Sequence, residues 1–349
     1  MTMNETTAPG AVDDVIDAFF AERIARADRL APSYAALWRR AAEASLGGKR
    51  LRPRLLLAAH DALGGGDRVS ALTAAAAFEL LHTALLLHDD VLDGDLVRRG
   101  RPNLAGGFAA DALDDGLGGA AASAWGEASG LLAGDVLISA VHALVARLET
   151  PARRAVHEIV DDSLFVTAAG EHADVGFGLG AIPASAADIV RMMEQKTASY
   201  SFAAPLRAAA AIAEAGPDVD GALHRVGTQL GFLYQLRDDV LGVFGAEERT
   251  GKSVLGDLRE GKRTLLIAFA EEQPAWRRVR HLFGRRSLEA DDAARLRDAL
   301  LACGAAEEIE RLIDEHRGQA CRDIEDASLP APLRRELVAL AHRIAERDG

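Results

Sequence analysis

Apolar residues recur three and four positions apart through most of the chain, which is the spacing of one face of an α-helix. This pattern runs through residues 12–29, 50–63, 68–97, 185–213 and 221–244. Apolar and polar residues do not alternate persuasively anywhere, so we expect few or no strands. Glycine and proline interrupt the pattern at plausible helix ends, as at Gly64-Gly65-Gly66 and Gly216-Pro217. The pattern predicts a single all-α bundle of ten or more helices.

The composition fits a helical protein with small ligands. Alanine, leucine, arginine and glutamate, which are strong helix formers, dominate the 349 residues, and 49% of all residues are hydrophobic. The formal net charge of −13 argues against general nucleic-acid binding. Local basic clusters at 49–54, 98–101 and 249–263 instead favour a small anionic ligand.

The chain contains no convincing linker, so we expect one domain over 1–349. Glycine and alanine dominate residues 104–130, which we interpret as a loop or insertion within that domain. The start through Asp14 is polar and acidic, unlike a signal peptide, and no run of about 18 uncharged apolar residues suggests a membrane span. Cys303 and Cys321 alone give no disulfide framework. These features predict a cytoplasmic protein without a membrane span.

The most informative residues are aspartates on two apolar helical segments, LLHTALLLHDDVLDGDLVRRG and GFLYQLRDDVLGVFG. Asp89, Asp90 and Asp93 fall on neighbouring positions of one helix. Carboxylates held this close repel one another unless a cation lies between them, and hard oxygen ligands suit Mg²⁺. The apolar runs predict acids at the mouth of an apolar cavity, where a diphosphate head and a hydrocarbon tail could both bind. The other Asp-Asp pairs lack this context, and we interpret them as solvated surface acids.

Taken in order, the motifs resemble those of the trans-isoprenyl diphosphate synthases, the polyprenyl synthetase family. The matching segments are GGKRLRP at 47–53, HDDVLDGDLVRRGRP at 88–102, LLAGD at 131–135, GEHADV at 170–175, EQKTA at 194–198, YQLRDD at 234–239 and GDLREGKRT at 256–264. Any one motif is weak, whereas the ordered set is highly specific. The resemblance implies an all-α bundle around a deep central cavity, usually built as a homodimer.

The resemblance also implies a Mg²⁺-dependent condensation of isopentenyl diphosphate with an allylic diphosphate. The allylic C–O bond ionises, the homoallylic double bond attacks the cation, and the departing diphosphate accepts a proton. About three Mg²⁺ ions would be bound by two facing Asp clusters. The implied ligands are Asp89 and Asp93 with Asp90 in support, and Asp238 with Asp239 in support. Gly242 stands where the fuller DDxxD pattern has its last acid.

The basic and polar motif residues divide by substrate, and arginine suits diphosphate because its planar fork can bind two oxygens. The positions that match the isopentenyl diphosphate site are Lys49, Arg52, His82 and Arg99. The positions that match the allylic diphosphate site are Arg98, Lys196, Lys252 and Lys262. Lys196, Thr197 and Gln235 match catalytic positions, and the oxygens of Thr197 and Gln235 would face the allylic cation. Taken alone, His82 would be an ordinary core histidine and Lys196-Thr197 a solvated helix face.

Product length should depend on the residues beneath the first Asp motif. At about 1.5 Å of rise per residue, Ala84 lies roughly 7 Å and Phe78 roughly 16 Å below Asp89. Ala84 and Leu85 occupy positions where bulky aromatics form a short floor in farnesyl-type relatives, and Leu81 and Phe78 follow at helical spacing. The absence of an aromatic at 84 and 85 favours a C20 product, geranylgeranyl diphosphate. A C15 product, a product of C25 or longer, and an ordinary core role for these residues stay open.

Two other functions use similar residues. A class I terpene cyclase also ionises a prenyl diphosphate, but it does not need the isopentenyl site at Lys49, Arg52 and Arg99. A regulatory subunit of a hetero-oligomeric synthase would be expected to lose acids from the first motif, which is intact here. The sequence therefore favours a catalyst, and leaves primer preference and pathway open.

Overall fold

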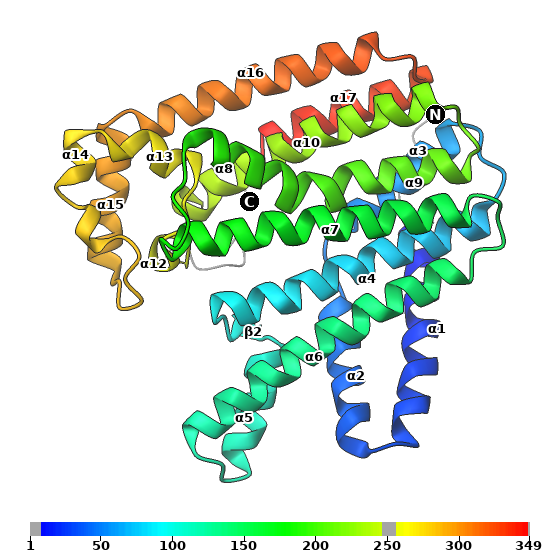
Figure 1. Ribbon diagram of the computed structural model, residues 1–349, viewed down its shortest axis with the longest axis horizontal. Helices are drawn as coiled ribbons and strands as arrows, with labels where there is room; N and C mark the ends of the chain where they lie inside the picture. The colour runs from blue at the N-terminus through cyan, green and yellow to red at the C-terminus, as the bar shows by residue number, and fades with distance from the viewer. Residues whose placement is uncertain (1–7, 246–255, 348–349) are drawn as a thin grey trace. The chain divides into compact units, whose positions relative to one another are not determined.

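A computed structural model describes residues 8–245 and 256–347 (Figure 1). The described part is built from helices, with one short antiparallel hairpin in which β1 (Val97–Arg98) pairs with β2 (Arg101–Pro102). The predicted all-α class is confirmed. Contacts divide the chain into two compact units, Met1–Val160 with Pro205–Gly216, and Asp161–Ala204 with Pro217–Gly349. The prediction of one domain over 1–349 stays a prediction.

The first unit is organised around the long helix that carries the first Asp motif. That helix, α4, begins where the Asp67 side chain accepts a hydrogen bond from the Ser70 amide at 3.0 Å, and it ends at Gly94, whose φ is 72°. It contacts α1, α3 and α6. The helices that lie wholly in this unit are α1 (Ala8–Asp28), α2 (Pro32–Ser45), α3 (Leu51–Ala62), α4 (Arg68–Asp93), α5 (Leu104–Asp114) and α6 (Gly119–Ala146), and most of α9 (Ala204–Ile212) belongs to it as well.

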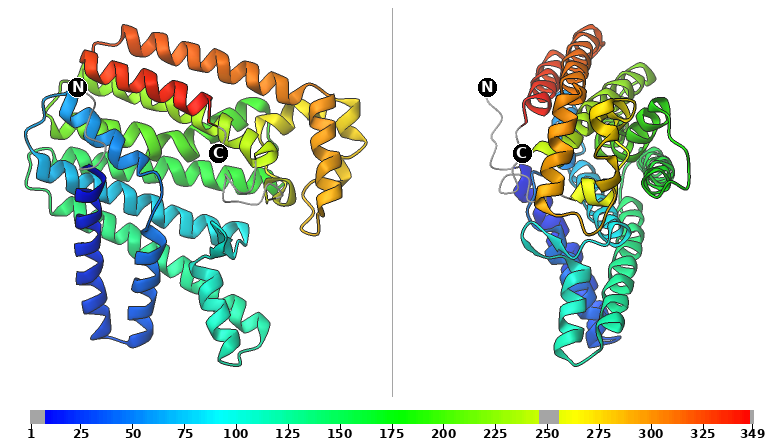
Figure 2. Two further views of the ribbon diagram at one scale, coloured as in Figure 1. Left: turned by 180° about the vertical axis from the view of Figure 1, so that it is seen from behind. Right: turned by 90° about the vertical axis from the view of Figure 1, so that its left-hand side faces the viewer.

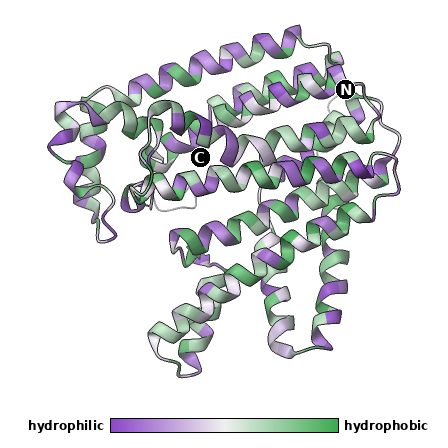
Figure 3. Ribbon diagram, in the orientation of Figure 1, coloured by the Kyte–Doolittle hydropathy of each residue, from purple (hydrophilic) through white to green (hydrophobic). Residues whose placement is uncertain are grey.

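Helices α4 and α6 pack closely because glycines on α6 face α4. A Cβ atom at Gly134 would lie 2.2 Å from His88 Nε2, and one at Gly130 would lie 2.6 Å from a Val91 methyl. Within the described residues, these two helices have the length and hydropathy that could span a membrane. Figure 3 shows hydrophobic residues along both. Most of the apolar window of α4 is buried, as expected of a core helix.

The glycine- and alanine-rich stretch 104–130 is helical, which differs from the expected loop or insertion. It forms α5 and the first part of α6. Asn103 caps α5 by accepting a hydrogen bond from the Gly106 amide at 2.8 Å. A Cβ atom at Gly126 would lie 2.4 Å from the Ala105 carbonyl oxygen. The small residues therefore permit close helix contact, which composition alone does not distinguish from loop flexibility.

The second unit surrounds α10 (Pro217–Phe244), the helix that carries the second Asp motif. Helices α16 and α17 run beside α10, as Figures 1 and 2 show from opposite sides. The chain reaches α10 through α7 (Arg153–Gly178), which starts in the first unit, then α8 (Ala186–Met193) and the π-helix η1 (Glu194–Ala203). The remaining elements are α12 (Gly256–Glu260), α13 (Leu265–Glu271), α14 (Pro274–Arg277), η2 (Arg280–Leu282), α15 (Ala290–Ala302), α16 (Ala305–Asp326) and α17 (Ala331–Ala345).

The π-helix η1 holds the EQKTA motif and packs on α10 with little space between the backbones. A Cβ atom at Gly227 would lie 2.5 Å from Ala203 Cα, and one at Gly231 would lie 2.3 Å from Ala198 Cα. Because π-helical turns are rare and recur at functional sites, this segment is held in an unusual geometry by its neighbours. The glycines of α10 therefore leave the space that the backbone of η1 occupies.

We expect Gly231→Ala to destabilise the protein, because the added methyl group must displace the backbone of η1. Overpacking of this kind costs about 1–3 kcal/mol. Gly221→Ala on the same helix is the control: its Cβ would meet only Arg225 Nη1, at 3.5 Å, so it should be neutral or slightly stabilising. Urea unfolding measures both, and equal stabilities would show that η1 adapts freely.

Candidate active site

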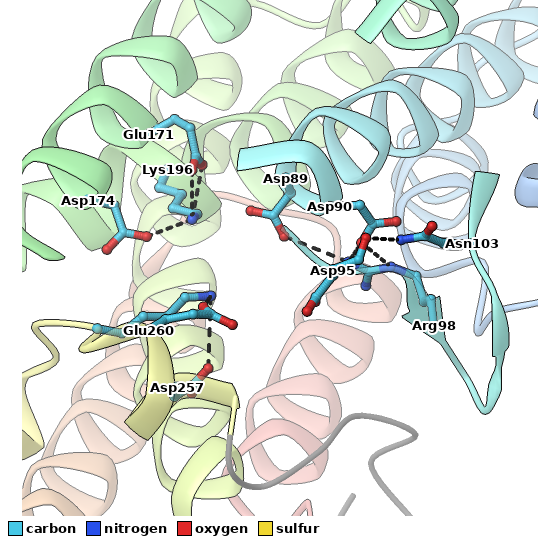
Figure 4. Close-up of polar contacts among 11 residues, drawn as sticks. Asp89, Asp90, Asp95, Arg98, Asn103, Glu171, Asp174, Lys196, Asp257 and Glu260 are labelled. Atoms are coloured by element: carbon cyan, nitrogen blue, oxygen red, sulfur yellow. Dashed lines mark hydrogen bonds and ion pairs between the residues drawn. The ribbon is translucent and has the colours of Figure 1, made fainter. Parts of the chain in front are cut away.

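The first acid cluster lies at the carboxyl end of α4 (Figure 4). Asp89 and Asp93 are half-buried, one helical turn apart, while Asp90 is buried and turned toward the hairpin. Arg98 on β1 donates from Nε to Asp90 Oδ1 at 2.9 Å, and its Nη2 atom lies 3.8 Å from Asp89 Oδ2. The left-handed Gly94 ends the helix so that the chain can return Arg98 to it.

Asp90 holds Arg98 in place at an electrostatic cost. Burial raises the pKa of Asp90, the hydrogen bond and charge of Arg98 oppose that rise, and Asp89 adds to it. The geometry makes Asp90 a partner of Arg98, and its supporting role at a metal site stays a prediction. Asp89 and Asp93 remain the better placed pair for an external cation.

The residues expected to bind isopentenyl diphosphate lie in the same unit. Lys49 is exposed in the turn before α3, Arg52 lies in the first turn of α3, and Arg99 lies in the hairpin turn with a φ of 54°. His82 is on α4, two turns before Asp89. Burial lowers the pKa of His82 well below its usual value, and the nearby Arg52, Arg98, Arg99 and Arg50 lower it further. Burial and the charges of these arginines thus both favour the neutral form of His82.

The four residues expected to form the product floor line α4 below the motif. Phe78, Leu81 and Ala84 are fully buried, and Leu85 is half-buried. Full burial is compatible with the wall of a product cavity and also with an ordinary core. Their role in setting product length stays a prediction.

The second cluster centres on Lys196, which lies in η1. Its Nζ atom lies 2.7 Å from Asp174 Oδ2 and 3.0 Å from Glu171 Oε2, both on α7 (Figure 4). The approach requires Gly170, because a Cβ atom there would lie 2.3 Å from the Lys196 amide nitrogen. The lysine is thus fixed at both its backbone and its side chain.

Thr197 and Gln235 are joined to the second Asp motif by hydrogen bonds. The Thr197 hydroxyl donates to Gln235 Oε1 at 2.6 Å, and Gln235 Nε2 donates to Asp239 Oδ1 at 2.7 Å. Asp239 is buried. Burial raises the pKa of Asp239 well above 3.8, and the charges of Asp257, Asp238 and Asp174 raise it further. The structure thus brings three predicted residues into one chain of contacts.

Asp257 on α12 occupies the space beside Gly242, the residue that stands in place of the motif's last acid. A Cβ atom at Gly242 would lie 1.9 Å from Asp257 Oδ2. Lys262 follows α12, with its Nζ atom 3.8 Å from Asp257 Oδ1 and 3.0 Å from Glu260 Oε2. A carboxylate from another helix therefore stands where the motif lacks its own.

Asp238 is more accessible than Asp239, with 45% of its side chain exposed. The Arg347 guanidinium lies 3.4 Å from Asp238 Oδ1 and 5.1 Å from the centre of the Tyr234 ring. Lys252, which was expected at the allylic site, lies outside the described residues.

Several residues of these clusters had no assigned role in the sequence. Glu171 and Asp174 lie inside the GEHADV motif, and Asp257 and Glu260 lie inside GDLREGKRT, so the motifs contained a signal that could have identified them. No sequence pattern pointed to Arg347, which reaches Asp238 from a position 109 residues away.

Both acid clusters are chemically suited to Mg²⁺. Their donors are carboxylate oxygens, the ligands this ion prefers. In the first unit Asp89 and Asp93 could hold it, and in the second unit Asp238 could do so with Asp239 and Asp257 beside it. The like charges that raise the pKa of Asp239 would be relieved by a divalent cation.

Residues 36–300 match the family model for polyprenyl synthetase. The chain belongs to this family, whose members are prenyltransferases. A short chain isoprenyl diphosphate synthase from Methanothermobacter thermautotrophicus is 35% identical over 65% of this chain, a match that spans 64% of that relative, less than two thirds of its length. A (2E,6E)-farnesyl diphosphate synthase from Mycobacterium bovis is 31% identical over 86% of this chain and 80% of its own.

The fold gives the same assignment. A crystal structure of geranylgeranyl pyrophosphate synthase from Corynebacterium glutamicum, complexed with isoprenyl diphosphate and magnesium, matches with a TM-score of 0.91 and 29% identity, over 97% of this chain and 98% of that chain. The chain therefore has the isoprenoid synthase fold, and its relatives differ in the length of the product they are named for.

We expect the carboxylate of Asp257 to act as the last acid of the second motif. Asp257→Ala should then weaken Mn²⁺ binding, measured by electron paramagnetic resonance in the presence of inorganic diphosphate, by roughly tenfold. Gly242→Asp alone should not tighten binding, because the space is filled. The exchange Gly242→Asp with Asp257→Gly should recover part of the loss. Unchanged Mn²⁺ affinity in a folded Asp257→Ala protein would contradict this role.

Proposed function

We propose that this protein catalyses the Mg²⁺-dependent condensation of isopentenyl diphosphate with an allylic diphosphate, giving an all-trans prenyl diphosphate. Family membership supports the reaction class. The observation that carries the proposal is the pairing, within the first unit, of the α4 acids with the basic field around His82. About three Mg²⁺ ions would act as Lewis acids toward the departing diphosphate.

In this proposal each group of residues has one task. The positions that match the allylic site are Arg98 in the first unit, Lys196 and Lys262 in the second, and Lys252; each would offer positive charge to a diphosphate as the C–O bond breaks. Thr197 and Gln235 present oxygen atoms to the allylic cation. Lys49, Arg52, His82 and Arg99 hold isopentenyl diphosphate so that its double bond can attack. The released diphosphate accepts the proton.

The basic field also separates this function from a terpene cyclase. A cyclase ionises one prenyl diphosphate and needs no second diphosphate site. Arg52, Arg98 and Arg99 all lower the pKa of His82, so three guanidinium groups lie near one position of α4. A second diphosphate site in the first unit would use such a group of arginines.

We expect Asp89→Ala to lower kcat by roughly 100-fold or more, because a cation ligand needed for ionisation is lost. Asp161→Ala, an exposed acid of another Asp-Asp pair, is the matched control and should keep full activity. Product formation is measured with isopentenyl diphosphate, each allylic primer and Mg²⁺. A folded Asp89→Ala protein with near-normal kcat would contradict the proposed metal site.

We propose a C20 product, and expect Ala84→Phe to shorten it toward C15. The phenyl ring would fill space that alanine leaves open. Because protein cores are densely packed, the neighbouring side chains cannot move far enough to restore that space. Chromatography of the dephosphorylated products, paired with a melting curve, tests this. A stable variant with unchanged product length would show that the floor is set by other residues, with Phe78 the next candidate.

We propose a cytoplasmic homodimer that associates through α6 and α5. Trp125, Leu131 and Leu132 on α6 and Leu113 on α5 are large apolar side chains that are exposed in the single chain. A second copy is the occupant that can cover them, because a self-complementary apolar face is the usual basis of twofold pairing. Sedimentation should give twice the chain mass for the parent and the single-chain mass for Leu132→Glu. A monomeric parent would contradict the proposal.

A further inference from the structure

Arg50 belongs to the basic GGKRLRP segment, but its side chain is directed into the protein. It is buried, with 8% of the residue exposed. Its Nη1 atom donates to the Ser45 carbonyl oxygen and to Glu79 Oε1, both at 2.9 Å, and its Nη2 atom lies 2.7 Å from Asp13 Oδ1. These partners belong to α2, α4 and α1. The guanidinium is thus committed to internal partners, unlike a diphosphate ligand.

The backbone of Arg50 is also unusual. Its φ is 47°, in the left-handed region that residues other than glycine rarely adopt. Such conformations persist when surrounding contacts determine them. Here the buried ion pair with Glu79 supplies such contacts. The conformation orients the two neighbours that are expected to bind isopentenyl diphosphate, Lys49 before it and Arg52 after it.

The same turn supports Arg99. Gly47 and Gly48 have φ values of 76° and 83°, and a Cβ atom on either would lie 3.4 Å from an Arg99 guanidinium nitrogen. Arg99 Nη1 donates to the Leu46 carbonyl oxygen at 3.3 Å. The Gly47–Arg52 turn therefore fixes the surface on which the Arg99 side chain lies.

We propose that Arg50 is a positioning residue for the isopentenyl diphosphate site. Its ion pairs with Glu79 and Asp13 hold the Gly47–Arg52 turn in the shape that gathers Lys49, Arg52 and Arg99 around one diphosphate. This inference rests on the proposed condensation function. The allylic side is held separately, since Arg98 is paired with Asp90 and Lys196 with Asp174. Loss of Arg50 should consequently affect one substrate and spare the other.

The test is the steady-state kinetics of Arg50→Met with each substrate varied in turn. We expect KM for isopentenyl diphosphate to rise about tenfold or more, with KM for the allylic substrate and kcat within about twofold of the parent. Glu79→Gln should shift the same KM in the same direction. Arg50→Lys keeps the charge and should recover part of the affinity. Equal changes in both KM values, or none, would overturn the proposal.

Two further variants separate positioning from loss of stability. Arg40→Met removes another partly buried arginine of the same unit, one that pairs with Asp111 at 2.5 Å and lies over the Phe108 ring. It should lower the melting temperature without the selective KM change. Arg50→Met combined with Glu79→Met replaces both partners by apolar groups and leaves no unpaired carboxylate at 79. If this variant is as stable as the parent and binds isopentenyl diphosphate equally well, Arg50 has no positioning role.

Calorimetry separates a failure of this inference from a failure of the proposed function. If the parent protein binds no isopentenyl diphosphate and forms no prenyl product, the proposed function fails, and the inference fails with it. If the parent binds isopentenyl diphosphate and the folded Arg50→Met protein binds it with unchanged affinity, the inference alone fails. Weaker binding by Arg50→Met, with rescue by Arg50→Lys, supports both.

Discussion

Repulsion among the carboxylates gathered within each unit is the constraint on which each acid cluster depends. Two unit charges 4 Å apart interact by about 4 kcal/mol at an effective dielectric constant of 20. Each unit offsets this repulsion with its own cation: Arg98 lies on Asp90, and Lys196 lies between Glu171 and Asp174. Each of these cations is therefore fixed by carboxylates of its own unit.

Close backbone approach, permitted by small residues, places those cations. Lys196 can reach α7 because Gly170 leaves room for the backbone of η1, and Gly231 of α10 leaves room on the other side. In the first unit, Gly134 lets α6 pack closely against His88. The position of Lys196 is thus coupled to packing, because a methyl group at Gly170 or Gly231 would displace the backbone of η1 that carries it.

The sequence predicted the helices well where their apolar period was regular. The pattern over 68–97 and 221–244 corresponds to α4 and α10, the two helices that carry the acids. Over 104–130 the apolar pattern did not predict the helices, because alanine and glycine differ little in hydrophobicity and their packing role depends on the facing helix. The sequence also did not predict the π-helical turn at EQKTA, because contact with α10, and not local propensity, imposes that geometry.

The features of the candidate site that the sequence did not predict also depend on contacts from other helices. The order of the motifs predicted roles for Asp89, Lys196 and Gln235, and these roles stay predictions. It gave no reason for Gly242, whose explanation is the carboxylate of Asp257 on another helix. Nor did it separate Arg50 from Arg52 within one basic segment. Arg50 is buried and pairs with Glu79, whereas Arg52 is half-buried, and only tertiary contacts distinguish them.

Helix α4 unites the tasks that such a synthase would need. Along its length Glu79 anchors the turn before α3, His82 lies in the basic field, Ala84 lies below the motif, and Asp89 belongs to the acid cluster. Because one helix carries all four residues, their separation along its axis is set by the number of residues between them, at about 1.5 Å each. A change of side-chain volume at Ala84 therefore leaves the position of the acid cluster along the helix unchanged.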